Sequence, residues 1–385
     1  MTGAMTGPRT IEDAWRAGKS AGNNFDAIRL FAAALVIFSH SFEVSGGGRA
    51  TEPFEIISGQ ISFGELAVLI FFALSGFLIA KSWAARPQLS VFMRNRVLRI
   101  TPALFVSVAL LVFIAGPLLT TMRPGAYFAD PGASCFLLNA IFISGCSALP
   151  GVFDGAPANA PLWTLGFEAL CYGLIATLGV SRILGAYACA ALALIVIAVG
   201  TFGAATGWGG GFLYKLSVLV PPFLVGSAMA LFAGRIPLDA RLAGVSALAL
   251  VISVFTGTLV ASFAFFGVYL VLWAGFARFG AALTRVGARG DFSYGLYIWG
   301  WPVQHVVAQT AGGPPLVNFL LSLPIAFAFA VLSWRFVEHP ALRLKTVLSP
   351  ASGAKRGLNF RNPAGSAPKA LPASPEAAIR IQNHD

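Results

Sequence analysis

The stretch FDAIRLFAAALVIFSHSFEVS, residues 25–45, decides the fold class of this 385-residue chain. Its length matches the roughly 20 residues that a helix needs to cross a bilayer. In lipid the backbone must satisfy its own hydrogen bonds, and long continuous apolar runs predict helices rather than the strands of a barrel. Similar runs follow at 64–84, 101–121, 163–180, 185–204, 212–233, 242–259, 262–282, 292–310 and 316–336. We therefore expect an all-α membrane bundle of about ten transmembrane helices.

The composition supports a lipid environment. Hydrophobic residues make up 57% of the chain and charged residues only 11%, with a mean hydropathy of +0.78. A soluble domain carries about 25% charged residues, so this chain could not cover its surface in water, and the lipid bilayer is an expected partner. The net charge of +11 does not indicate nucleic-acid binding, because the basic residues are scattered between the apolar runs.

The positions of Lys and Arg predict the orientation. They collect in alternate connecting segments, and cytoplasmic loops are the ones enriched in these residues. Both termini are then expected in the cytoplasm. We divide the chain into an N-terminal cytoplasmic segment at 1–24, a transmembrane domain at 25–346 and a tail at 347–385. The tail is rich in Ala, Pro, Ser and Gly and is predicted to be a disordered cytoplasmic extension.

The apolar segment SCFLLNAIFISGC at 134–146 is too short to cross a bilayer. We interpret it as an interfacial or re-entrant part of an outer loop. Cys135 and Cys146 bracket this segment, and an oxidising compartment could join them. Spacing alone does not establish disulfide geometry, so this question stays open at the level of sequence.

The first span contains three ionisable residues, Asp26, Arg29 and His40. Such residues are costly inside a membrane and are functional candidates by default. Arg29 and His40 are eleven residues apart, about three helical turns, so they face the same way some ~16 Å apart. Asp26 is placed to pair with Arg29, and Glu43 lies one turn beyond His40. The alternative is that Arg29 reaches the membrane interface and His40 only bonds another helix.

The second span contains FFALSGFL at 71–78, in which Ser75 and Gly76 are small. Small residues allow another helix or a ligand to approach closely, and both interpretations stay open.

The stretch RNRVLRITP at 94–102 precedes the third span, which we expect Pro102 to open. Its three arginines, Arg94, Arg96 and Arg99, would lie at the inner face. Guanidinium groups suit phosphate binding, and they also anchor a membrane protein by charge alone.

The stretch PLWTLGFE at 161–168 leads into the fourth span. Glu168 would lie within the membrane and need a partner, and His40 at similar depth is a candidate. Trp163 fits either a binding site or an ordinary interfacial aromatic belt.

Taken together, these elements give the chain a resemblance to the acyltransferase 3 family of bacterial membrane acyltransferases, from Asn23 to about Lys345. Each element is weak alone, but their order and placement on the spans are specific. The elements that match family motifs are the Arg29 and His40 pair, 71–76, 96–102, 162–168, 293–297 and 337–343.

The resemblance implies transfer of an acyl group, usually acetyl, from cytoplasmic acyl-CoA to a hydroxyl of an envelope or exported saccharide. It implies a multi-pass protein of the bacterial inner membrane, with acyl-CoA as donor substrate, no bound cofactor and no metal. The catalytic residues are then expected to be His40, Arg29 and Glu168. Donor binding is expected from Arg94, Arg96, Arg99, Ser75 and Gly76, and acceptor binding from Trp163, Tyr297 and Glu43.

Two departures from the family pattern stand out. Many members have a histidine where this chain has Gly300, so any role of that histidine is absent or moved to His305. Some members carry a second, soluble hydrolase-like domain, and here one membrane domain is expected to do the work.

Alternatives remain open for the mechanism and for the class of protein. His40 could deprotonate the acceptor for direct attack or carry the acyl group itself. Glu168 could hold the imidazole tautomer or bind the acceptor, and the acceptor could be a small molecule or lipid instead of a saccharide. A secondary transporter or flippase is the main rival, although no internal repeat supports it. A scaffold or sensor gives no reason for Arg29 and His40 to share a face.

Overall fold

The structure is a computed structural model that describes residues 9–347 except 144 and 209. Within this part the regular secondary structure is helical, and strand-like pairing is limited to isolated bridges such as Thr10–Pro237. The all-α expectation is therefore confirmed. The tail predicted to be disordered lies, apart from its first residue, outside the described residues.

Eight helices in the described part are long and apolar enough to cross a membrane. Three of them contain a wider π-helical turn, at Leu111–Ala115 (η2), Phe263–Gly267 (η6) and Trp334–Glu338 (η8). The eight are α2 (Phe25–Ser45), α4 (Phe63–Ala85), α5 to α6 (Leu89–Leu119), η5 to α9 (Ala160–Val180), α10 (Ala186–Thr206), α11 (Gly210–Leu231), α13 to α14 (Leu259–Phe276) and α17 to α18 (Pro315–Lys345).

Two further helices lie where the sequence predicted spans, so all ten predicted runs are helical. The helix α12 (Ala240–Thr256) is apolar but has 17 residues. The helix α16 (Ser293–Thr310) is buried at most of its positions, including Gln304. A helix surrounded by protein rather than lipid can be less apolar, which explains why α16 does not stand out by hydropathy.

Shorter helices fill the connections. They are α1 (Ile11–Ala21), η1 (Arg49–Thr51), α3 (Pro53–Ser58), α7 (Pro124–Ala129), α8 (Pro131–Phe136), η3 (Leu137–Ile141), η4 (Phe153–Gly155), α15 (Ala281–Thr284) and η7 (Val286–Arg289).

The third span begins earlier than expected. Pro102 does not open it, because α5 starts at Leu89 and continues through this proline. Prolines are tolerated inside membrane helices when neighbouring groups compensate for the lost hydrogen bond. The basic stretch is therefore helical, and Arg94, Arg96 and Arg99 project from a fixed helix rather than from a loop.

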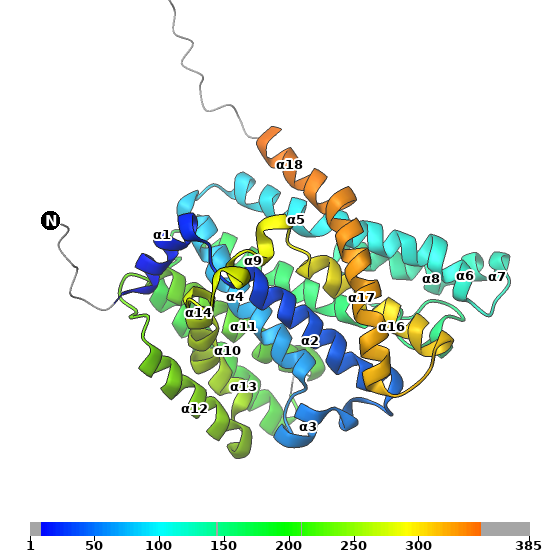
Figure 1. The fold of residues 1–385 in the computed structure, drawn as a ribbon, viewed down its shortest axis with the longest axis horizontal. Helices are drawn as coiled ribbons and strands as arrows, with labels where there is room; N and C mark the ends of the chain where they lie inside the picture. Colours follow the sequence, from blue (N-terminus) through cyan, green and yellow to red (C-terminus); the bar gives the residue numbers. More distant parts are fainter. Residues whose placement is uncertain (1–8, 144, 209, 348–385) are drawn as a thin grey trace, which may run out of the picture. The chain divides into compact units, whose positions relative to one another are not determined.

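The helix α2 lies in the middle of the bundle, beside α4, α16 and α17 (Figure 1). The helix α4 also packs along α11, where two glycines permit a close crossing. A Cβ atom on Gly76 would collide with the Phe223 carbonyl, and one on Gly226 would collide with the Ala73 carbonyl. This contact is the small-residue packing typical of membrane helices.

The N-terminal segment contains a helix that the sequence reasoning did not predict. Thr10 and Asp13 form a capping box at the start of α1. Ile11 is fully buried, Trp15 packs edge-on against Phe77, and Glu12 pairs with Lys81 of α4. The segment before the first span is therefore docked on the bundle.

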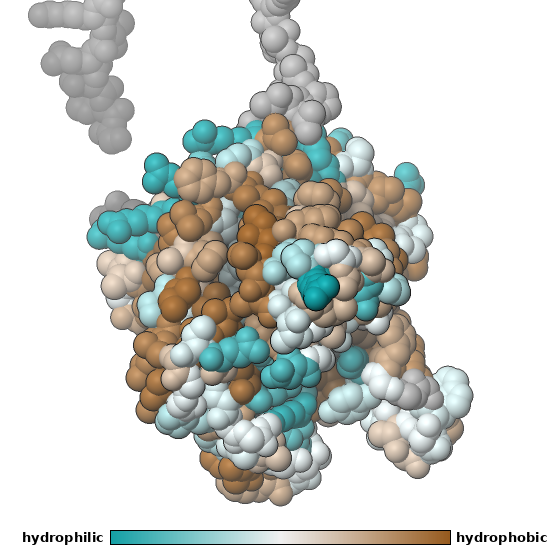
Figure 2. Space-filling model, turned by 90° about the vertical axis from the view of Figure 1, so that its right-hand side faces the viewer, coloured by the Kyte–Doolittle hydropathy of each residue, from teal (hydrophilic) through white to brown (hydrophobic). Residues whose placement is uncertain are grey.

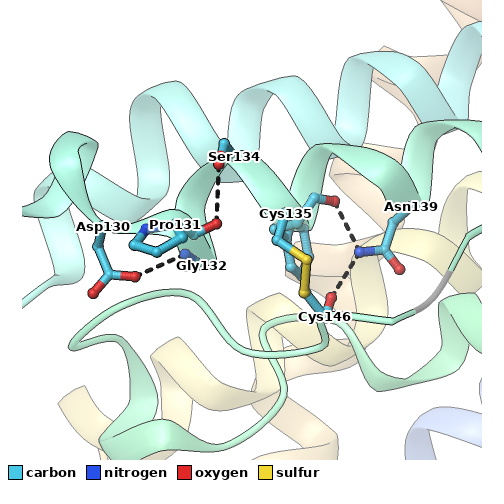
Figure 3. Close-up of a disulfide and its surroundings, with 8 residues drawn as sticks. Asp130, Pro131, Gly132, Ser134, Cys135, Asn139 and Cys146 are labelled. Atoms are coloured by element: carbon cyan, nitrogen blue, oxygen red, sulfur yellow. Dashed lines mark hydrogen bonds between the residues drawn. A yellow bond between two sulfur atoms is a disulfide. The ribbon is translucent and has the colours of Figure 1, made fainter.

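Cys135 and Cys146 form a disulfide (Figure 3). Cys135 lies within the short apolar helix that α8 and η3 form (Pro131–Ile141), which is shorter than a membrane span, as expected. Asn139 fastens the loop by donating from its amide to the carbonyls of Phe136 and Cys146, at 2.8 and 2.9 Å.

The surface agrees with a lipid environment. Figure 2 shows large hydrophobic areas on one face, between hydrophilic patches near its top and in its lower half. Large apolar side chains are exposed along several spans, for example Phe105, Leu248 and Phe255. In water such a surface would promote aggregation, whereas in lipid it is the ordinary exterior.

Candidate functional site

Two adjoining cavities lie between α2, α4, α9 and α16. The arginine cavity is lined by Arg29, Arg96 and Arg99 and has an empty volume of about 780 Å³. The histidine cavity is lined by His40 and Glu43 and has an empty volume of about 1160 Å³. Arg29 and His40 both come from α2, so the two predicted residues face neighbouring spaces.

Arg29 is held by two carboxylates. Its Nη1 lies 3.8 Å from Oδ1 of Asp26, which confirms the predicted pairing, and 3.3 Å from Oδ2 of Asp291. Asp291 was not predicted as a site residue. It precedes α16 and accepts hydrogen bonds from the backbone N–H and the hydroxyl of Ser293 in the first turn of that helix.

Arg99 shares Asp291 with Arg29. Its Nη1 also lies 3.4 Å from Oε2 of Glu338, a buried residue on η8 that accepts a 3.0 Å bond from Ser333. Burial raises the pKa of the Asp291 carboxyl, but the Arg99 and Arg29 guanidinium groups outweigh it and lower this pKa below its ordinary value. Arg99 is therefore part of a buried ion network, and its charge is already matched.

Arg96 differs from its neighbours on α5. It lines the arginine cavity and makes no ion pair within the described residues. Its guanidinium carbon lies 5.9 Å from the centre of the Tyr172 ring, a cation–π distance. Arg94 does not line either cavity. The structure thus divides the predicted arginine trio, with Arg96 the member best placed to meet an anion.

Glu168 lies in the arginine cavity and not beside His40. Its Oε1 accepts a bond from Tyr172 and a long 3.4 Å bond from Ser75. No hydrogen bond joins Glu168 to His40 in the described part of the chain, so the predicted tautomer-holding contact is wrong. The prediction considered only the depth of Glu168 in the membrane. Depth does not determine the face of α9 on which Glu168 lies, and this face is directed to the arginine cavity.

Gly76 lines neither cavity. Its backbone contacts Phe223, and its carbonyl accepts a 3.0 Å bond from the Ser227 hydroxyl. The structure therefore favours the helix-packing interpretation of Gly76 over the predicted donor-binding role, whereas Ser75 does line the arginine cavity.

His40 lines the histidine cavity and stacks edge-on against Trp301 at 4.8 Å between ring centres. Its Nδ1 is buried and has no hydrogen-bond partner. Nε2 is consequently the ring nitrogen left to meet a substrate. A histidine with one nitrogen available can act as a general base near neutral pH.

Glu43 and Trp163, for which acceptor binding is predicted, also line the histidine cavity. The Nζ atom of Lys215 lies 4.5 Å from the Trp163 ring centre. Arg49 also lines the cavity, and it pairs with Glu55 and Glu65 at 2.9 and 2.5 Å. Lys215 was not predicted as a site residue, and its signal was a single cation near the start of an apolar span.

Gly300 packs where a larger residue would not fit, because an added Cβ would lie 2.8 Å from Ile37. His305 stacks on Phe153 at 4.6 Å and lies 5.1 Å from Trp301. It lines neither cavity, and its Nε2 has no partner. Trp301 therefore contacts the rings of both His40 and His305.

Tyr297 lines both cavities, as do Val68 and Thr164. The predicted acceptor-binding residue thus lies at the junction of the two spaces. Among the described residues no group of three or more His, Cys, Asp or Glu side chains is arranged to hold a metal ion.

Comparison with known proteins agrees with the resemblance seen in the motifs. The acyltransferase domain of the acyltransferase 3 family matches residues 23–335. An O-acetyl transferase of Shigella phage Sf6 is 29% identical, over 82% of this chain and 95% of the relative. Nodulation protein 10 of Rhizobium leguminosarum bv. viciae is 27% identical, over 85% and 95%. No solved structure matches significantly.

Proposed function

Because the chain belongs to the acyltransferase 3 family, we propose that it transfers an acetyl group from cytoplasmic acyl-CoA to a hydroxyl of an envelope or exported saccharide in the bacterial inner membrane. The observation that carries this proposal is the pair of adjoining cavities. One is lined by arginines and the other by an imidazole, so donor and acceptor have separate places that meet near the reacting groups. The name of the phage relative supports acetyl as the group transferred.

The arginine cavity is suited to the anionic end of acyl-CoA. Arg96 faces the cavity without a carboxylate partner in the described residues, and Arg29 and Arg99 add positive charge around it. Guanidinium groups bind phosphates through charge-assisted hydrogen bonds. The thioester would then reach toward Tyr297 and the histidine cavity.

The proposed chemistry uses His40 as the base. Its Nε2 accepts the proton of the acceptor hydroxyl while the oxygen attacks the thioester carbonyl. The carbon–sulfur bond breaks, and the sulfur receives the proton from His40 and leaves as free CoA. In the second possible route the imidazole attacks first, forms an acyl-histidine and passes the acyl group to the acceptor. An acylated protein detected by mass spectrometry without acceptor would distinguish this route.

The histidine cavity is suited to a saccharide. Glu43 can accept hydrogen bonds from sugar hydroxyls, and the Trp163 ring offers an apolar surface for a sugar ring. A small-molecule or lipid acceptor would need the same hydroxyl near His40, so glycan mass spectrometry of cells with and without the protein identifies the acceptor.

The direct test replaces the base. His40→Ala is expected to reduce acetyl transfer by at least about 100-fold, because general base catalysis contributes that much or more. CoA release and acetylated glycan are measured with purified protein in nanodiscs. His305→Asn, which changes a histidine lining neither cavity, should stay within about threefold of wild type. Retained activity in His40→Ala, with normal expression, would contradict the proposal.

A second test separates donor binding from anchoring charge. Arg96→Ala is expected to raise the KM for acetyl-CoA about tenfold, since a lost charged hydrogen bond costs about 1.5–3 kcal/mol. The matched control is Arg94→Ala, which removes the same charge from the same helix outside the cavity. Equal KM values for acetyl-CoA in the two variants would contradict the proposed phosphate-binding role of Arg96.

A further inference from the structure

Three side chains line both cavities, and we call them the waist: Val68 of α4, Thr164 of α9 and Tyr297 of α16. They come from three helices that are far apart in sequence. Because these three side chains line both spaces, they mark the place where the two cavities adjoin.

A hydrogen bond spans the waist. The Thr164 Oγ1 and the Tyr297 hydroxyl lie 2.6 Å apart, and both hydroxyls also lie within 3.1 Å of the Pro161 carbonyl. Tyr297 and Thr164 are both buried, so this contact is not open to bulk solvent. The bond joins the first turn of α9 to the second turn of α16 and holds the phenol at the junction of the two cavities.

The Tyr297 ring is also supported from the side of the arginine cavity. Phe71 packs edge-on against it with 5.8 Å between ring centres. The ring is therefore restrained by an aromatic contact on one side and by the hydroxyl contacts at its tip. A group passing from one cavity to the other must pass this ring and the Val68 side chain.

We propose that the waist is the size filter for the acyl group, admitting acetyl and excluding longer chains. This inference rests on the proposed function, in which the thioester approaches from the arginine cavity and the base lies in the histidine cavity. The hydrogen bond between Thr164 and Tyr297 can be exchanged for another, because a single neutral hydrogen bond contributes little net stability. A two-carbon group therefore needs only a small displacement of Tyr297, whereas each further methylene must be accommodated against Val68 and the ring.

The experiment measures acyl-chain preference with the full chain in nanodiscs. Acetyl-, butyryl- and hexanoyl-CoA are compared by the kcat/KM for CoA release in the presence of acceptor. Wild type should prefer acetyl-CoA over hexanoyl-CoA by at least about 100-fold, a discrimination of about 2.7 kcal/mol. Val68→Ala widens the waist without touching the hydrogen bond and should reduce this preference about tenfold or more. Tyr297→Phe keeps the ring but removes the hydroxyl and its hydrogen bonds. It should also reduce the preference for acetyl-CoA over hexanoyl-CoA.

Matched controls change the same residue types outside the waist. Val108→Ala removes the same two methyl groups from a fully buried position of α5 that lines neither cavity. Tyr269→Phe removes a hydroxyl that donates a 2.9 Å bond to the Pro237 carbonyl. Both controls should keep the wild-type preference, and thermal unfolding verifies that every variant is folded.

The outcomes separate the filter from the proposed function. Wild type that uses acetyl-CoA but accepts hexanoyl-CoA equally well would overturn the filter alone. An unchanged preference in both waist variants, with acetyl transfer retained, would also overturn it. Wild type that releases no CoA from any donor would overturn the proposed function and the filter with it.

Discussion

Asp291 organises the arginine cavity at the scale of one residue. Its carboxylate contacts Arg29 of α2 and Arg99 of α5, two helices separated by α4 in the chain. Arg99 in turn reaches Glu338 at the far end of the sequence. One carboxylate therefore sets the positions of two cations that the proposed donor site needs.

Replacing Asp291 with Asn tests this role. The change keeps the size of the side chain and removes its charge, leaving two guanidinium groups without their common partner. Breaking a buried ion pair in this way costs about 3–5 kcal/mol. We expect a lower Tm in detergent and at least about a tenfold lower kcat/KM for acetyl-CoA.

Asp26→Asn is the matched control for that prediction. Asp26 is the other carboxylate near Arg29, but the separation is 3.8 Å and the side chain is 43% exposed. An exposed pair contributes about 0–1 kcal/mol, so this variant should remain close to wild type. Similar losses in the two variants would show that Asp291 has no special role.

The sequence could identify Arg29 and His40 because ionisable residues inside apolar runs stand out. Asp291 was missed since it lies between two spans, where a carboxylate is unremarkable. The Glu168 to His40 contact was wrong for a different reason. Position along a span estimates depth, but the direction in which a side chain points depends on how the helices are rotated and packed.

At the scale of elements, the crossing of α4 and α11 depends on backbone contact. Gly76 and Gly226 bring the two helices together, and the Ser227 hydroxyl bonds the Gly76 carbonyl at 3.0 Å. This crossing holds α4 in the position from which Val68 and Ser75 line the cavities.

Gly76→Ala is expected to destabilise the protein. The new Cβ would collide with the Phe223 carbonyl, and the two helices would have to separate. Overpacking of this kind costs about 1–3 kcal/mol. Thermal unfolding and the folded fraction after solubilisation measure the loss.

Gly173→Ala on α9 (Trp163–Val180) is the comparison, because nothing lies within 4 Å of an added Cβ there. Alanine is favoured over glycine in helices by up to about 1 kcal/mol, so this variant should be neutral or slightly more stable. A drop in Tm as large as that of Gly76→Ala would contradict the packing explanation.

The sequence predicted the helices well but not all of their ends. The run at 25–45 agrees with α2 at both bounds, since Asn24 and Gly46 flank an uninterrupted apolar helix. The start of α5 was misplaced because Pro102 usually marks a first turn, yet here it lies within the helix. The π-helical turn that carries Glu338 has no sequence signature, because it arises from packing.

At the scale of the whole molecule, the sequence predicted the order of ten long helices, eight of which are long and apolar enough to cross a membrane. It did not predict which helices are neighbours. The contact of α2 with α16 joins residues more than 250 positions apart, and no periodicity predicts it. The docking of α1 on α4 was equally hidden, since Glu12 and Lys81 are ordinary charged residues in sequence.

The α1 contact predicts a pH dependence of stability. The Lys81 hydrogen bond lowers the pKa of the Glu12 carboxyl below its ordinary value of 4.5, and partial burial only opposes this. A depressed folded-state pKa gives stability that is present above the unfolded-state pKa and lost as the pH falls through the folded-state pKa. Glu12→Gln should therefore lower the Tm at pH 7, and the difference from wild type should shrink in acid.

Lys81→Met completes a double-mutant cycle that tests this prediction. In that background Glu12→Gln should have a smaller effect on Tm, because Lys81 is gone and only the more exposed Arg16, at 3.0 Å, still pairs with Glu12. A Tm difference between wild type and Glu12→Gln that stays constant down to the lowest pH would contradict the assigned pairing.

The separation of the two cavities has an electrical consequence under the proposed reaction. The phosphates of CoA stay among the arginines, and the proton taken up by His40 returns to the departing sulfur. The acyl group replaces the hydrogen of the acceptor hydroxyl, and that hydrogen replaces the acyl group on sulfur, so neither side of the waist gains or loses charge. Moving one elementary charge through a membrane potential of 100 mV would involve about 2.3 kcal/mol, and here no net charge moves. The membrane voltage therefore neither drives nor opposes the transfer, and its direction is set by the thioester alone.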